Sequence, residues 1–192
     1  MIRALYDWTL SLASHRHALA ALAAVAFIES SVFPIPPDIL MIPMIVAAPH
    51  RAFLIAAVST LASVLGGLAG YLIGLFLFDS IGQPVLAFYG MTDKFEVFAQ
   101  TYNSWGAWAV LIAGVTPFPY KVVTILSGAT DLSLPVFMLA SVLARGLRFF
   151  LVAALLWKFG APIRDFIERR LGLMFTLAVA LLLGGFYAVK FL

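Results

Sequence analysis

The chain has 192 residues, of which 64% are hydrophobic and 11% are charged, and its net charge is +3. A soluble domain carries about 25% charged residues because its surface must be hydrated, so this composition excludes an ordinary soluble domain. High hydrophobicity with few charges also excludes a disordered chain. The sequence therefore predicts an all-α integral membrane protein with space for roughly five or six hydrophobic segments.

The first half of the chain contains two long apolar stretches. Residues 1–17 mix charged and apolar side chains, and we expect them to form an interfacial N-terminal segment. The stretch 18–48 is apolar apart from Glu29 and Asp38. Residues 52–78 carry no charge at all, which predicts a membrane-spanning helix.

The second half begins with a polar stretch, 79–104, in which aromatic residues at helical spacing predict an amphipathic surface helix within a loop. Apolar residues follow at 105–128 and at 134–159. We expect residues 18–165 to form one membrane domain. Residues 166–192 are expected to hold the end of a basic loop and a C-terminal transmembrane helix.

Proline interrupts two of the apolar stretches, and each interruption predicts a broken helix. Proline lacks a backbone N–H and clashes with the preceding turn, so no continuous helix passes through a cluster of prolines. In lipid, backbone opened in this way is tolerated only inside protein or beside a watery cavity. We therefore expect re-entrant helical hairpins near 18–48 and 105–130, with breaks at Pro34, Pro36, Pro37, Pro117 and Pro119.

The two breaks share one pattern. Each reads Pro-x-Pro-x-charge, and the charged residue is Asp38 in the first break and Lys121 in the second. A single spanning helix between the two hairpins would invert one relative to the other, as in transporters built from inverted repeats. The expected fold is thus about three full transmembrane helices plus two proline-broken re-entrant hairpins, arranged as an inverted repeat.

Charged side chains within apolar stretches cost free energy to insert and are functional candidates by default. Five residues are of this kind: Glu29, Asp38, Lys121, Arg145 and Arg148. Two acids against three bases leave an excess of positive charge, which favours an anionic substrate such as a phosphate headgroup. We interpret the five as candidates for substrate binding or proton coupling.

Structural alternatives exist for the same charges. Asp38 follows Pro37, which is an ordinary start for a helix. Lys121 either extends to the membrane surface or needs an anion, supplied by the facing hairpin or by a ligand. Arg145 and Arg148 are three residues apart on one helix face, and the alternative to a substrate role is pairing with the two acids.

Three glycines, Gly66, Gly70 and Gly74, repeat every four residues in the uncharged stretch. Small residues at this spacing let two helices approach closely in a membrane. We therefore interpret the three positions as a helix-packing face.

Together these motifs resemble the DedA family of bacterial membrane proteins, within the VTT-domain superfamily, and most closely its YqaA-like branch. The resemblance covers roughly residues 15–165. Its motifs are Glu29 with Pro34-x-Pro36-Pro37-Asp38, Gly66-Gly67-x-x-Gly70-Tyr71-x-x-Gly74, and Thr116-Pro117-x-Pro119-Tyr120-Lys121 with Ser127-Gly128.

The resemblance implies a multi-pass protein of the bacterial inner membrane with two facing re-entrant hairpins. It also implies transport of lipids such as undecaprenyl phosphate or phosphatidylethanolamine, often linked to the proton gradient. Glu29 and Asp38 stand where the family has two acids in the first hairpin. The second hairpin departs from the family pattern, which has arginines where this chain has Gly114 and Tyr120. The candidates to replace these two charges are Lys121, Arg145 and Arg148.

The leading hypothesis is a flippase or scramblase for phosphate-headed lipids. The alternative is a proton- or ion-coupled transporter of a small solute. An enzyme is not expected, because His15, His17 and His50 lie near segment ends and no G-x-S-x-G, H-E-x-x-H or P-loop motif occurs. The sequence indicates no catalytic residue, metal site, cofactor or nucleic-acid partner, and it leaves a homo-oligomer open.

Overall fold

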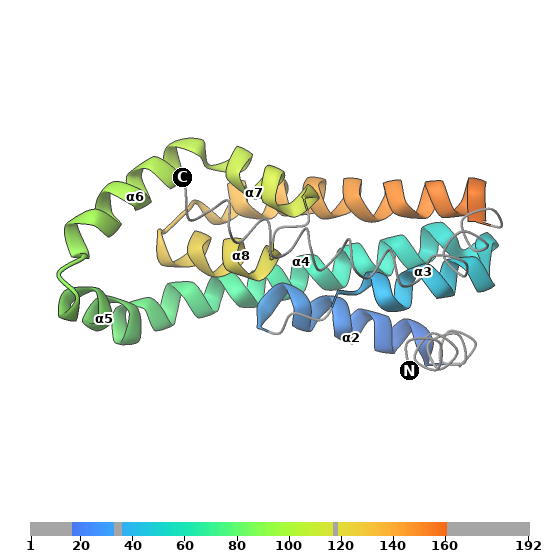
Figure 1. Cartoon of the computed structure of the whole chain (residues 1–192), viewed down its shortest axis with the longest axis horizontal. Helices are drawn as coiled ribbons and strands as arrows, with labels where there is room; N and C mark the ends of the chain where they lie inside the picture. Colours follow the sequence, from blue (N-terminus) through green and yellow to red (C-terminus); the bar gives the residue numbers. More distant parts are fainter. Residues whose placement is uncertain (1–16, 33–35, 117–118, 161–192) are drawn as a thin grey trace, which may run out of the picture.

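The computed structural model of the chain describes residues 17–32, 36–116 and 119–160, and every regular element within these ranges is helical. The two termini and the tips of both proline breaks lie outside the described residues (Figure 1). The elements, in chain order, are α2 (Ala18–Ser31), α3 (Asp38–Ala47), the short 3-10 turn η1 (Pro49–Arg51), α4 (Ala52–Leu77), the π-helical turn η2 (Phe78–Gly82), α5 (Gln83–Phe88), α6 (Thr92–Trp105), α7 (Ala107–Val115), α8 (Tyr120–Ala129) and a final helix, Leu134–Gly160.

Both helix breaks fall where proline forbids a continuous helix. Helix α2 ends at Ser31 and α3 begins at Asp38, while α7 ends at Val115 and α8 begins at Tyr120. The chain turns back at each break, so α2 and α3 form one helical hairpin and α7 and α8 form another. The two hairpins enter from opposite ends of the molecule and meet near its middle (Figure 1).

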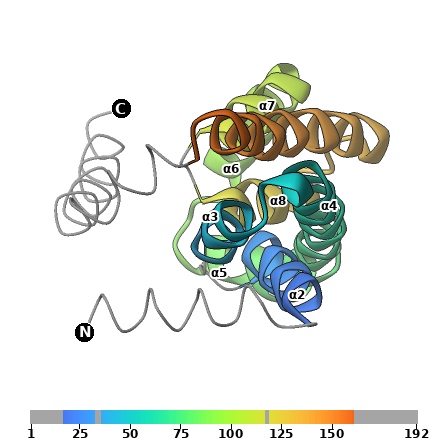
Figure 2. The same cartoon turned by 90° about the vertical axis from the view of Figure 1, so that its right-hand side faces the viewer.

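Helix α4 runs the length of the bundle between the hairpins. Seen along the bundle, it lies between α2 and the final helix, with α8 beside it (Figure 2). Its glycines allow this contact. A Cβ atom on Gly66 would overlap the backbone of Phe27 in α2, and one on Gly74 would overlap the backbone of Ile125 in α8. The backbones therefore approach as closely as small-residue packing permits in a membrane.

Two apolar clusters fill the bundle, one for each hairpin. The first surrounds α3 and is formed mainly by Leu22, Met41, Ile45, Ile55 and Phe149. The second surrounds α8 and is formed mainly by Tyr71, Val110, Tyr120, Val123 and Phe137. Each cluster joins its hairpin to both α4 and the final helix. The two long helices therefore connect the two hairpins.

Two helices of the described chain are long and apolar enough to cross a membrane, Pro49–Phe88 and Leu134–Gly160. Their outer faces carry large exposed apolar side chains, among them Leu61, Leu65 and Leu147. Such a surface is unfavourable in water and is suited to lipid. The third expected span, at the C-terminus, and the expected interfacial segment at the N-terminus lie outside the described residues apart from His17.

The expected loop after the first span is mostly helical, which corrects the sequence analysis. The chain continues from α4 through η2 into α5 and reverses only at Gly90, which has a positive φ of 62°. The side chain of Gln83 donates a hydrogen bond of 2.7 Å to Asp79, and this pair stabilises the added turn. The amphipathic helix expected nearby is α6, and none of its residues is buried.

The glycine contacts predict the effect of added methyl groups. We expect Gly74→Ala to lower stability by about 1–3 kcal/mol, because the new Cβ meets backbone that cannot rotate away. Gly146→Ala is the matched control, since the nearest atom to its Cβ would be 3.9 Å away, and there we expect no loss. Thermal unfolding in detergent, followed by circular dichroism, measures both. Equal melting temperatures for the two variants would contradict the close helix contact.

Candidate functional site

The final helix crosses the meeting point of the two hairpins and places two arginines there. Arg145 Nη2 lies 3.0 Å from Glu29 Oε2, and Arg148 Nη2 lies 2.6 Å from Asp38 Oδ2. On one straight helix the two acids would point in opposite directions, because nine residues rotate by about 180°. The proline break at Pro36 and Pro37 turns both toward the same arginine face. These are the two ion pairs among the described residues.

Arg145 is completely buried and is held on several sides. Its Nε atom donates a hydrogen bond of 2.6 Å to Ser63, and its Nη2 atom binds Glu29. The guanidinium carbon lies 4.8 Å from the centre of the Tyr120 ring and 4.6 Å from that of Phe149. Cation–π contacts of this kind are strongest where water is excluded. Arg145 therefore joins α2, α4, α8 and its own helix at one point.

Hydroxyl groups complete this buried network. Ser30 donates to Glu29 at 3.1 Å and shares a hydrogen bond of 2.7 Å with Ser63. Tyr120 donates to Ser141 at 2.5 Å. The sequence analysis did not single out these residues as site candidates. Serines within otherwise apolar stretches are a usable signal, because a buried hydroxyl needs a partner.

One nitrogen of this network has no partner. Arg145 Nη1 is the only buried side-chain nitrogen or oxygen in the described part of the chain that makes no hydrogen bond. A buried donor without an acceptor is costly, so this position can take an oxygen atom from water or from a ligand.

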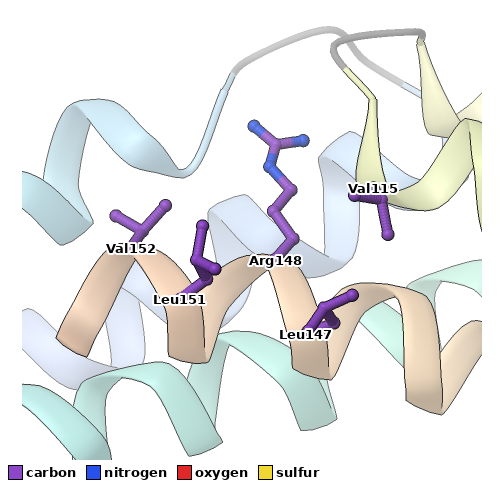
Figure 3. Close-up of a pocket in the computed structure, with 5 residues that line it drawn as sticks. All are labelled: Val115, Leu147, Arg148, Leu151 and Val152. Carbon is purple, nitrogen blue, oxygen red and sulfur yellow. The ribbon is translucent and has the colours of Figure 1, made fainter. Parts of the chain in front are cut away.

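The second pair, Arg148 and Asp38, is more open, with 22% of each side chain exposed. Asp38 is the first residue of α3, where an acidic side chain also interacts favourably with the helix dipole, and its carboxylate accepts a hydrogen bond from Arg148. Arg148 also lines a hollow of about 310 Å³, together with Val115, Leu147, Leu151 and Val152 (Figure 3). Its guanidinium points away from its own helix (Figure 3), and it binds Asp38 at the start of α3.

Lys121 is the second residue of α8, as the break after Pro119 predicts. Its Nζ atom donates a hydrogen bond of 3.2 Å to the carbonyl of Val32, at the end of α2. Among the described residues, no carboxylate lies within 4.0 Å of it. Among the three alternatives for Lys121, the structure does not favour pairing with an acid, because Glu29 and Asp38 both pair with arginines.

A second contact joins the two breaks. Thr124 donates a hydrogen bond of 3.0 Å to the carbonyl of Ser30, next to the contact between Lys121 and Val32. Each contact supplies a donor from α8 to a carbonyl that the end of α2 leaves free. The tip residues Pro34 and Pro117 lie outside the described residues, while Pro36, Pro37 and Pro119 lie between helices as expected.

The five charged candidates form two ion pairs and leave one further cation. Two ion pairs cancel, and Lys121 remains as the excess positive charge beside them. No group of acidic, histidine or cysteine residues suited to a metal occurs within the described ranges. The arrangement is thus a cationic centre between two helix breaks, lined by hydroxyls and aromatic rings.

The two ion pairs are expected to differ in their effect on stability. Arg145→Met leaves Glu29 without its counter-ion in a buried place and should cost about 3–5 kcal/mol. Arg148→Met affects a partly exposed pair and should cost about 1 kcal/mol or less. Thermal unfolding of both variants in detergent tests this order. A larger loss for Arg148→Met would contradict the structural role given to Arg145.

Comparison with known proteins now places the chain. The VTT domain matches residues 35–158. An uncharacterized protein of Haemophilus influenzae is 36% identical over 168 residues, covering 85% of this chain and 87% of that protein. An uncharacterized protein of Histophilus somni is 39% identical over the same length and with the same coverage. No solved structure matches the chain significantly. The matched residues contain the two ion-paired arginines and Lys121, and the chain belongs to the VTT-domain (DedA) family of membrane proteins.

Proposed function

We propose that the protein moves phosphate-headed lipids across the membrane, as a flippase or scramblase. The observation that carries the proposal is Lys121, a cation without a carboxylate partner in the described chain, placed where the two helix breaks meet. Lys121 Nζ donates to one backbone carbonyl, so its positive charge remains available to an anion. A lipid phosphate supplies that anion together with acyl chains that suit the exposed apolar faces.

The membrane arrangement is part of the proposal. We infer a multi-pass protein of the bacterial inner membrane, with about three full transmembrane helices and two re-entrant hairpins related as an inverted repeat. Two observations support it, the two spanning helices and the hairpins that enter from opposite ends (Figure 1). Assignment to the YqaA-like branch stays a prediction.

Aromatic residues support a mid-membrane position for the charges. Trp157 is exposed and packs on Phe53, with 5.9 Å between the ring centres. Such rings mark the membrane–water boundary. Along the final helix, Arg148 lies about 14 Å and Arg145 about 18 Å from Trp157, at about 1.5 Å for each residue. Half of a hydrocarbon core is about 15 Å, so both arginines lie near its centre.

An alternative function is proton- or ion-coupled transport of a small solute. The observation that favours it is Glu29, whose Oε2 atom accepts bonds from Arg145 and Ser30 while its Oε1 atom accepts none among the described residues. An oxygen of the carboxylate without a protein partner is available to an ion or to a polar solute. This function needs no lipid headgroup, so the two proposals make different predictions.

Lipid transport should depend on Lys121. In vesicles containing the purified protein, we expect Lys121→Gln to slow the movement of a fluorescent phosphatidylethanolamine by roughly tenfold or more, since a charge-assisted contact is lost. Lys158→Gln is the matched control, because Lys158 lies against Phe159, about 15 Å along the final helix from Arg148 at about 1.5 Å for each residue, and should not matter.

Three further measurements decide between the functions. A fluorescent polyprenyl phosphate and a ceramide, which lacks phosphate, test the headgroup requirement. If ceramide moves as fast as phosphatidylethanolamine and the polyprenyl phosphate, the site is not selective for phosphate. A pH gradient that drives solute uptake without any lipid movement would favour the alternative. Release of inorganic phosphate from the lipids would contradict a transport function and indicate an enzyme.

A further inference from the structure

The hollow beside Arg148 combines three features that belong together in a lipid-binding site. Its wall is apolar apart from the arginine, and its lining residues come from α7 and from the membrane-spanning final helix. Leu147 and Leu151 are 59% and 56% exposed, so this side faces the lipid. The arginine stands between Val115 and Val152, directly above the two leucines (Figure 3).

Arg148 has capacity to bind an additional anion. A guanidinium carries five N–H donors, and one donor atom of Arg148, Nη2, binds Asp38. Its Nε and Nη1 atoms make no hydrogen bond to any described residue. Guanidinium groups bind phosphate with two parallel hydrogen bonds, and they retain their charge in apolar surroundings.

The two arginines therefore have different accessibility. Arg145 is completely buried between two aromatic rings, and a headgroup cannot reach it without opening the bundle. Arg148 is partly exposed and opens sideways into the membrane. A lipid arriving from the bilayer meets Arg148 first.

We infer that the hollow lined by Val115, Leu147, Arg148, Leu151 and Val152 is the lateral binding site at which a lipid phosphate engages Arg148. The phosphate binds the nitrogens that Asp38 leaves free, and the acyl chain lies over Leu147 and Leu151. The guanidinium N–H groups that Asp38 leaves free select a lipid whose phosphate oxygens accept them over a lipid without phosphate. This inference rests on the proposed function, because it names the place where the transported lipid enters.

Photolabelling tests binding without requiring transport. The full chain is placed in vesicles of digalactosyldiacylglycerol, a bilayer lipid without phosphate, together with phosphatidic acid that carries a diazirine on its acyl chain, and adducts are located by mass spectrometry. Diacylglycerol with the same acyl chain is the probe without phosphate. We expect phosphatidic acid to label Leu147 and Leu151 roughly tenfold more than diacylglycerol does, since one charge-assisted contact supplies a factor of this size.

Two variants and a matched control locate the site. Arg148→Gln should remove the preference for phosphatidic acid, and Leu151→Trp should fill the hollow and lower labelling by either lipid. Val142→Trp is the control, because Val142 is 47% exposed on another face of the same helix and should label as wild type does. The melting temperature of each variant shows that it is folded. Preference for phosphatidic acid that survives in Arg148→Gln would overturn the inference.

Inorganic phosphate distinguishes a lipid headgroup from a free anion. Labelling that persists in excess inorganic phosphate supports the lipid site. If inorganic phosphate lowers labelling by phosphatidic acid to the level seen with diacylglycerol, the site binds free phosphate and the inference is overturned.

Transport in the same vesicles separates this inference from the proposed function. Transport unchanged in Leu151→Trp overturns the lateral site alone. Phosphate-dependent labelling without any lipid movement overturns the function and keeps the site.

Discussion

Backbone opened by proline inside an apolar bundle must find partners for its polar groups, because lipid offers none. In this protein, side chains after the second break supply partners to the backbone before the first. Thr124 and Lys121 donate to the carbonyls of Ser30 and Val32. Both contacts join one hairpin to the other. Their mutual contact therefore fixes where the hairpins meet and where the cationic centre lies.

The close meeting depends on small residues. Helix α4 lies against both hairpins, and its glycines let α2 and α8 contact its backbone directly. Gly128 in α8 contributes in return, since a Cβ atom there would overlap the backbone of Tyr71. Only at this separation can Arg145 reach Ser63 on α4 and Glu29 on α2 at the same time. Helix packing thus sets the distances between the residues of the charged network.

The network contains a closed part and an open part. Arg145, with Glu29 and the serine hydroxyls, is buried and connects the helices, while Arg148 and Asp38 lie beside a hollow that faces lipid. Under the proposed function the two parts would have different roles. The buried part would hold the helix breaks in place, and the open part would exchange partners as a lipid phosphate arrives. Lys121 adds a charge that no carboxylate of the described residues compensates.

Local patterns in the sequence were enough to predict the helix breaks, the long helices and the packing glycines. Proline chemistry located both breaks, hydropathy located the first residues of α4 and of the final helix, and four-residue spacing marked the packing glycines. The same rules gave five charges within apolar segments and their positive excess. These features depend on a residue and its near neighbours, so they can be read from the chain alone.

The tertiary structure determined which residues pair with Arg145 and Arg148. The sequence left open whether Arg145 and Arg148 bind acids or substrate, and which acid each would meet. It missed the serine and tyrosine hydroxyls around Arg145, and it took the helical segment after Leu77 for a loop. These outcomes depend on the rotation and depth of helices that are far apart in the chain. Local periodicity does not encode either quantity, because both follow from how the whole bundle packs.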